Sequence, residues 1–126
     1  RRVLFRSEIG AIPIFVDCDD TYCMNVDLVE SKITKKTKAI VPVHFTGYMT
    51  NMPKLLKISK KYKIPIVEDA CQSILAEING KKAGTWSSMG AFSLHPLKNI
   101  NVWSDGGIIV TNNKKNINVY FILLYS

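Results

Sequence analysis

The chain has 126 residues, with 17 Lys and Arg against 10 Asp and Glu, a formal net charge of +7 and a mean hydropathy of +0.06. This length suits one domain with its own hydrophobic core, and no apolar run approaches the roughly 20 residues of a membrane-spanning helix. The basic residues are spread over several segments without a recognised nucleic-acid module, so we expect no nucleic-acid partner and no membrane partner.

Cysteine usage indicates a reducing compartment. Cys18, Cys23 and Cys71 form an odd set without CxxC or His-paired metal spacing. We therefore expect reduced thiols, a cytoplasmic protein and no metal site.

The two ends of the chain differ from its middle. Residues 1–8 are basic but lack the apolar segment of a signal peptide, and we expect them to be foreign to the fold or disordered. Residues 114–126 carry a weak apolar pattern that stops abruptly, which indicates an atypical, truncated tail. The folded domain is therefore expected over residues 9–113.

Three short apolar runs alternate with helical patterns. The β-branched runs Ile12–Val16, Ala39–Val43 and Ile64–Val67 each predict a buried strand. Strands that alternate with helices form βαβ units, whose strands are parallel. The sequence therefore predicts an α/β fold of three layers, αβα, with a mostly parallel sheet between helices.

Two amphipathic helices are expected between these strands. Asn25 precedes the first, over residues 26–33, and Asn51 precedes the second, which ends near Lys63. Asparagine is a preferred N-cap residue, and Pro53 is tolerated in the first helical turn because its missing N–H has no helical partner there.

The second half of the chain predicts two pairs of strands. Asn79-Gly80 lies between extended segments and is a strong signal for a β-hairpin. Met89–Leu94 and Gly107–Val110 are then predicted to pair around a loop that contains Lys98.

Polar residues follow the predicted parallel strands, where ligands of α/β sheets bind. Asp17, His44 and Asp69 occupy such ends. We expect His44 to be a hydrogen-bonded strand-end histidine rather than a catalyst. After Asp69, residues 70–73 predict a small-residue turn into a short helix.

Lys98 is the candidate nucleophile. It stands alone among apolar and small polar neighbours, where lost hydration lowers the pKa of an amine and makes it reactive. The alternative is an ordinary surface-loop lysine. Asp69 has two interpretations as well. It is a helix N-cap, or it forms a pyridoxal phosphate site together with Lys98, in which the lysine holds the cofactor and the carboxylate pairs with the pyridinium nitrogen.

The chain resembles the DegT/DnrJ-type (StrS-type) sugar aminotransferase family from about Ile9 to Asn113. The matching stretches are GAIPIFVDCDDTYCMNVDLVESKITKKTKAIVPVHFTG, VEDACQS, EINGKKAG, FSLHPLKN and DGGIIVTN. The resemblance implies part of the large domain of a fold-type-I pyridoxal 5′-phosphate enzyme. It also implies that the chain is an internal fragment, because the family's upstream phosphate turn and its C-terminal domain are absent.

Carried over by position, the resemblance makes Lys98 the Schiff-base residue and proton shuttle, and Asp69 the partner of the pyridine nitrogen. Gln72 matches the residue that contacts the ring hydroxyl; its alternative is a surface glutamine. Ser93 matches the hydroxyl that holds the cofactor phosphate; its alternative is a strand residue without a role. Trp103 either covers the site or has only a packing role in the fold.

The implied activity of the parent is a ping-pong transamination from an amino acid, expected to be glutamate, to a keto group of a nucleotide-linked sugar. The implied parent is a homodimer. The rival interpretation is a catalytically inactive truncated or regulatory relative that keeps only the fold. Departures from the family are Ser87-Ser88 in place of Gly-Asp, and Ser104 in place of a common Gly.

Overall fold

The structure is a computed structural model that describes residues 9–104 and 106–114. The predictions for residues 1–8 and for 115–126 of the tail lie outside the described residues. The described elements are η1 (Val26–Leu28), α2 (Val29–Lys32), α3 (Met52–Tyr62), β1 (Val67–Asp69), β2 (Glu77–Ile78), β3 (Lys81–Lys82), β4 (Met89–Ser93) and β5 (Gly107–Val110).

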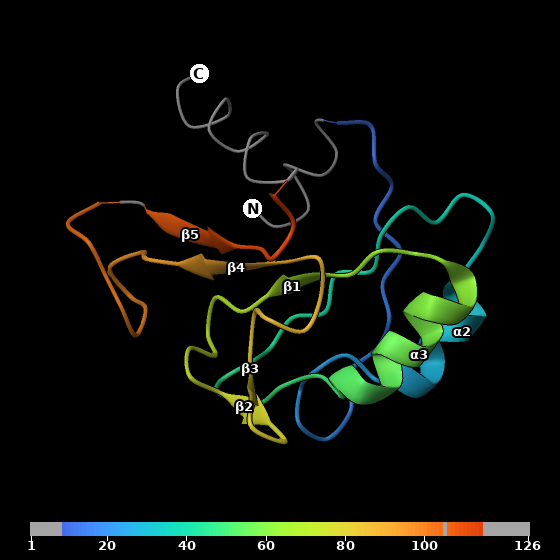
Figure 1. The fold of residues 1–126 in the computed structure, drawn as a ribbon, viewed down its shortest axis with the longest axis horizontal. Helices are drawn as coiled ribbons and strands as arrows, with labels where there is room; N and C mark the ends of the chain where they lie inside the picture. The colour runs from blue at the N-terminus through green and yellow to red at the C-terminus, as the bar shows by residue number, and fades with distance from the viewer. Residues whose placement is uncertain (1–8, 105, 115–126) are drawn as a thin grey trace.

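The main sheet is mostly parallel. Its order is β1-β4-β5, with β1 parallel to β4 and β4 antiparallel to β5 (Figure 1). An extended segment, residues 40–43, adds a further row beside β1 through parallel bridges at Ile40↔Ile66 and Val43↔Asp69. The predicted α/β class and mostly parallel sheet are therefore confirmed.

A proline explains why this further row consists of bridges instead of a continuous strand. The Ile40 N–H donates to the carbonyl of Pro65 and the His44 N–H donates to that of Asp69, at 3.0 and 2.9 Å. Pro42 lies midway between these two donors and has no N–H, so the ladder loses one bond. The predicted second strand is thus paired with β1, but with a gap at its centre.

The prediction of a buried first strand over Ile12–Val16 is wrong for the described structure. Ile12 is 84% exposed and Ile14 66% exposed, and no described segment pairs with this run. Its β-branched residues favour an extended backbone, but a strand also needs a neighbouring backbone to bond with.

The short helix predicted after Asp69 is also absent. Residues 70–76 form successive turns, with the Ser73 N–H donating to the carbonyl of Ala70 at 3.1 Å and the Ala76 N–H to that of Ser73 at 3.2 Å. Leu75 lies in the left-handed region, with φ of 64°. A left-handed residue ends a right-handed helical turn, so the segment cannot continue as a helix.

Both predicted helices form with the expected caps. The side chain of Asn25 accepts a hydrogen bond from the Asp27 N–H, and that of Asn51 from the Lys54 N–H. The first helix is divided into a 3₁₀ turn, η1, and one α-helical turn, α2. The Asn79-Gly80 hairpin forms as predicted between β2 and β3.

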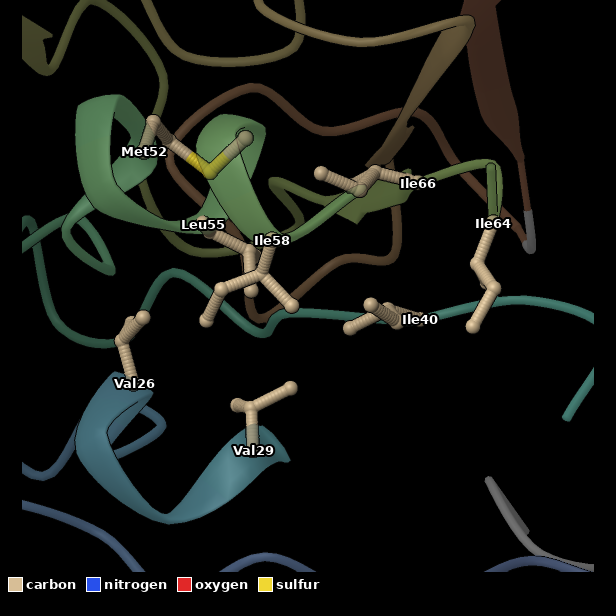
Figure 2. Packing of buried hydrophobic residues seen from close by; sticks show 8 residues of the cluster. All are labelled: Val26, Val29, Ile40, Met52, Leu55, Ile58, Ile64 and Ile66. Carbon is tan, nitrogen blue, oxygen red and sulfur yellow. The ribbon is translucent and has the colours of Figure 1, made fainter. Parts of the chain in front are cut away.

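The core lies between these helices and the sheet. Figure 2 shows side chains of α3 pointing toward those of the sheet and of the first helix. The cluster consists of Val26, Val29, Ile40, Met52, Leu55, Ile58, Ile64 and Ile66. All helices of the described residues contribute to this one cluster, so they form a single layer on one face of the sheet. None of them is long and apolar enough to cross a membrane.

The substitution Leu55→Ala tests this core. Leu55 is fully buried, so we expect a loss of about 2–5 kcal/mol in the free energy of unfolding, measured by urea denaturation. Leu28→Ala is the matched control, because Leu28 is 40% exposed, and we expect less than about 1 kcal/mol there. Equal losses in the two variants would contradict the described packing.

Candidate active site

A cavity of about 440 Å³ opens where the parallel rows end. Its lining residues come from three successive loops: Thr46 and Gly47 after residues 40–43, Gln72 and Ile74 after β1, and Leu97, Lys98 and Asn99 after β4. The cavity is thus at the carboxyl edge of the sheet, where α/β proteins bind ligands. Its volume is within the usual range for small-molecule sites.

Lys98 lies half-buried in the loop that leaves β4. The loop is folded by local bonds: the Lys98 N–H donates to the carbonyl of His95 at 2.8 Å, and the Leu97 N–H donates to Nδ1 of His95 at 3.2 Å. Lys98 and Gln72, 26 positions apart in the sequence, line the same cavity. The structure therefore brings these two predicted site residues together.

Asp69 ends β1 at the same edge. It is level with Val43 on one side and with Ala91 of β4 on the other. Its Oδ1 accepts a hydrogen bond from the Cys71 N–H at 3.2 Å. The side chain therefore stabilises a turn, not a helix, and the N-cap alternative is wrong in that form. Asp69 is not among the residues that line the cavity of Lys98 and Gln72.

Ser93 ends β4, two residues beyond the position level with Asp69. Its Oγ accepts a hydrogen bond from the His95 N–H at 3.2 Å, so the hydroxyl proton can be donated elsewhere. Ser93 lines a neighbouring apolar cavity of about 220 Å³, not the cavity of Lys98. Ile74 and Asn99 line both cavities.

Glu68, a buried charged residue next to Asp69, was missed by the sequence interpretation. It is fully buried on β1, directly before Asp69. Its carboxylate accepts five hydrogen bonds: from His44 Nε2 at 3.1 Å, the backbone N–H groups of Gly84, Trp86 and Ser87 at 2.8 Å each, and Ser87 Oγ at 2.9 Å. The sequence signal was an acidic residue inside an otherwise apolar strand.

These donors hold Glu68 in its charged form. Burial alone raises the pKa of a carboxyl group, but the hydrogen bonds from the side chains of His44 and Ser87 and from the backbone of Gly84 and Ser87 outweigh it. The pKa of Glu68 is therefore held below the ordinary value of 4.5.

His44 is a buried, hydrogen-bonded histidine, as predicted. Its Nδ1 accepts the Thr50 N–H at 3.3 Å, so the proton of the neutral ring lies on Nε2 and is donated to Glu68. His44 does not line the cavity of Lys98.

Gly84 can reach Glu68 because it has no side chain. Its φ is +79°, and a Cβ there would lie 2.6 Å from the ring of Phe92. Gly90 of β4 lies opposite, where an added Cβ would be 2.3 Å from Gly84 Cα. Two glycines thus allow the segment at 84–87 to lie directly against β4.

No group of three or more His, Cys, Asp or Glu residues suited to a metal ion occurs within the described residues. The edge of the sheet carries a lysine, an amide, a hydroxyl and a carboxylate, at Lys98, Gln72, Ser93 and Asp69.

Comparison with known proteins identifies the family. Residues 5–125 match the model of the DegT/DnrJ/EryC1/StrS aminotransferase family. The chain belongs to this family. The sequence resemblance to sugar aminotransferases is therefore confirmed.

Two curated relatives illustrate the match. The UDP-N-acetyl-3-dehydro-alpha-D-glucosamine 3-aminotransferase of Acidithiobacillus ferrooxidans is 42% identical over 82% of this chain and 28% of the relative. The dTDP-3-amino-3,4,6-trideoxy-alpha-D-glucose transaminase of Micromonospora megalomicea is 45% identical over 88% of this chain and 30% of the relative. The chain thus spans less than a third of either relative.

A solved structure supports the same fold. NtdA of Bacillus subtilis, solved with the cofactor PMP bound, is 37% identical with a TM-score of 0.75. The likeness covers 84% of this chain and 24% of NtdA.

The substitution Glu68→Gln tests the charge state of the buried carboxylate. Because the pKa of Glu68 is lowered by folding, its stabilisation is present above about pH 4.5 and is lost as the pH falls through the lower folded value. Urea unfolding of both proteins between about pH 7 and pH 3 should show a difference in the free energy of unfolding that shrinks below about pH 4.5.

Glu77→Gln is the control for this titration, because Glu77 is an exposed glutamate paired with Lys82. Its stability curve should follow that of the unsubstituted protein closely. A Glu68→Gln difference that is constant with pH would contradict the charged assignment.

Proposed function

We propose that the protein carrying this chain is a pyridoxal 5′-phosphate-dependent aminotransferase. It transfers an amino group from an amino acid, glutamate in our proposal, to a keto group of a nucleotide-linked sugar. The observation that carries the proposal is the cavity that Lys98 shares with Gln72 at the carboxyl edge of the sheet, in a chain of the aminotransferase family.

The residues present fit this cofactor. Lys98 offers a half-buried amine, Gln72 an amide at the same cavity, and Ser93 a hydroxyl whose proton is available to a phosphate. Asp69 brings a carboxylate to the end of the neighbouring strand. NtdA was solved with PMP, the amine form of the same cofactor, and the two curated relatives are named for UDP- and dTDP-linked sugars.

When bound, the cofactor supplies an electron sink that stabilises negative charge on the substrate carbon. Nζ of Lys98 would hold the cofactor covalently. The amine of Lys98 would also accept the proton from the α-carbon of the donor. Asp69 would pair with the pyridine nitrogen and keep it protonated, Gln72 would contact the ring hydroxyl, and Ser93 would donate to the phosphate.

The proposed cellular setting is the cytoplasm. Cys18 and Cys23 are free thiols, and Cys18 is exposed. Exposed free thiols suit a reducing compartment, which supports a cytoplasmic location.

A second copy of the protein is the proposed partner. Leu97 is 86% exposed and Trp103 fully exposed, both in the loop of Lys98. Trp103 therefore does not pack against the described residues. Large apolar side chains beside a site indicate an interface, and we propose that a homodimer covers them.

Covalent labelling tests the proposed enzyme. Borohydride reduction of the whole protein with bound pyridoxal 5′-phosphate, followed by peptide mass mapping, should place the cofactor on the peptide that contains Lys98. Lys98→Arg should abolish the label and lower kcat by about 10²–10⁴-fold, because the proton-transferring amine is lost. Lys81→Arg, on the exposed hairpin, is the matched control and should change neither. A folded protein labelled elsewhere, or not at all, would favour the inactive relative.

Sedimentation velocity tests the homodimer. Trp103→Glu should raise the dimer dissociation constant by about 30-fold or more, the equivalent of about 2 kcal/mol. Leu75→Glu is the control at another exposed apolar residue, 75% exposed, and should leave the constant unchanged. A monomer at all concentrations of the unsubstituted protein would contradict this part of the proposal.

A further inference from the structure

Glu68 and Asp69 are consecutive residues of β1 with different surroundings. Successive side chains of a strand point to opposite faces, so Glu68 shares a face with Ile66, which packs in the helix-side core, and Asp69 points to the other face. Glu68 does not line the cavity of Lys98. The shortest covalent connection from Glu68 to the site is therefore the backbone of β1, which carries Asp69 as its next residue.

His44 binds both of these residues. Its backbone N–H donates to the carbonyl of Asp69 at 2.9 Å, and its ring donates to the carboxylate of Glu68 at 3.1 Å. The Asp69 N–H donates to the carbonyl of Pro42 at 2.9 Å. Residues 40–44 thus bind the last two residues of β1: the side chain of Glu68 and the backbone of Asp69.

The segment at 84–87 fixes Glu68 from a second direction. Three of its four backbone N–H groups and the Ser87 hydroxyl bind the carboxylate, and the chain then continues into β4, which is paired with β1. The Ala70 N–H donates to the carbonyl of Ala91 on that strand at 2.9 Å. Glu68 therefore links the neighbours on both sides of β1 at the level of Asp69.

We propose that Glu68 is a positioning residue that fixes the direction of the Asp69 carboxylate toward the ring nitrogen of the cofactor. This inference rests on the proposed function. Glu68 acts as a fixed anion whose five donors prevent rotation and sliding of β1. A glutamine cannot replace it, because its amide nitrogen would face N–H donors and leave buried groups without partners. His44 and Ser87 contribute to the same positioning because their side chains bind the Glu68 carboxylate.

The test is a double-mutant cycle of Glu68→Gln and Asp69→Asn in the whole protein. The first measurement is the dissociation constant of pyridoxal 5′-phosphate. The second is the ¹⁵N chemical shift of its labelled ring nitrogen, which reports the proton that Asp69 holds. Glu68→Gln alone should weaken binding about 10–100-fold, as losses of supporting hydrogen bonds do at metal ligands, and shift the ring nitrogen toward its unprotonated value.

In the Asp69→Asn background, Glu68→Gln should weaken binding by less than about twofold further, because the group through which it acts is gone. Equal losses in both backgrounds would show a general structural effect and overturn the positioning role. An unchanged ring-nitrogen shift in Glu68→Gln would overturn it as well. Glu77→Gln, the exposed control, should leave both measurements unchanged.

Milder variants keep the proposal testable if Glu68→Gln does not fold. Ser87→Ala removes only the hydroxyl bond and should weaken binding about two- to fivefold, with the same dependence on Asp69. His44→Gln keeps a side-chain donor for Glu68 and should bind more tightly than His44→Leu. Equal binding by the two His44 variants would contradict the proposal.

The outcomes separate this inference from the proposed function. An unsubstituted protein that takes no cofactor on Lys98 contradicts the proposed function. A protein that does so, but whose affinity and ring-nitrogen shift are independent of Glu68, contradicts the positioning role alone.

Discussion

A buried carboxylate destabilises a protein unless hydrogen bonds replace the water it has lost, and Glu68 obtains these bonds from two segments far apart in sequence. His44 lies 24 residues before it, and the donors of the segment 84–87 lie 16 to 19 residues after it. No buried side-chain N or O atom within the described residues lacks a partner. Besides the backbone bonds that pair β1 with its neighbours, Glu68 therefore joins residues 40–44, β1 and the segment 84–87 at the edge of the sheet.

The local signals in the sequence were sufficient for much of the fold. Asn25 and Asn51 cap helices through their own side chains, and Asn79 adopts the left-handed φ of 51° that its hairpin turn requires. Such features depend on residues close in sequence, so periodicity and cap chemistry could predict them. The pairing of β4 with β5 followed in the same way from two apolar runs around a turn.

Features that depend on distant partners could not be predicted in this way. The run Ile12–Val16 has the composition of a strand, yet strand formation also requires a neighbour that composition does not specify. The five donors of Glu68 come from segments whose proximity only the folded chain reveals. Lys98, Asp69, Gln72 and Ser93 were predicted from the family resemblance; the structure places Lys98 and Gln72 at one cavity and Asp69 and Ser93 at neighbouring strand ends.

The groups that bind Glu68 differ in their chemistry from the groups of the proposed site. In our proposal the site gains and loses protons at its lysine, and each change alters the local field. Three of the five bonds to Glu68 come from backbone N–H groups, which do not titrate, and a fourth comes from a hydroxyl. The remaining donor, His44, has its tautomer fixed by the Thr50 N–H. Glu68 and Asp69 point to opposite faces of β1. The charge of Glu68 can therefore stay constant while protons are transferred on the face of Asp69.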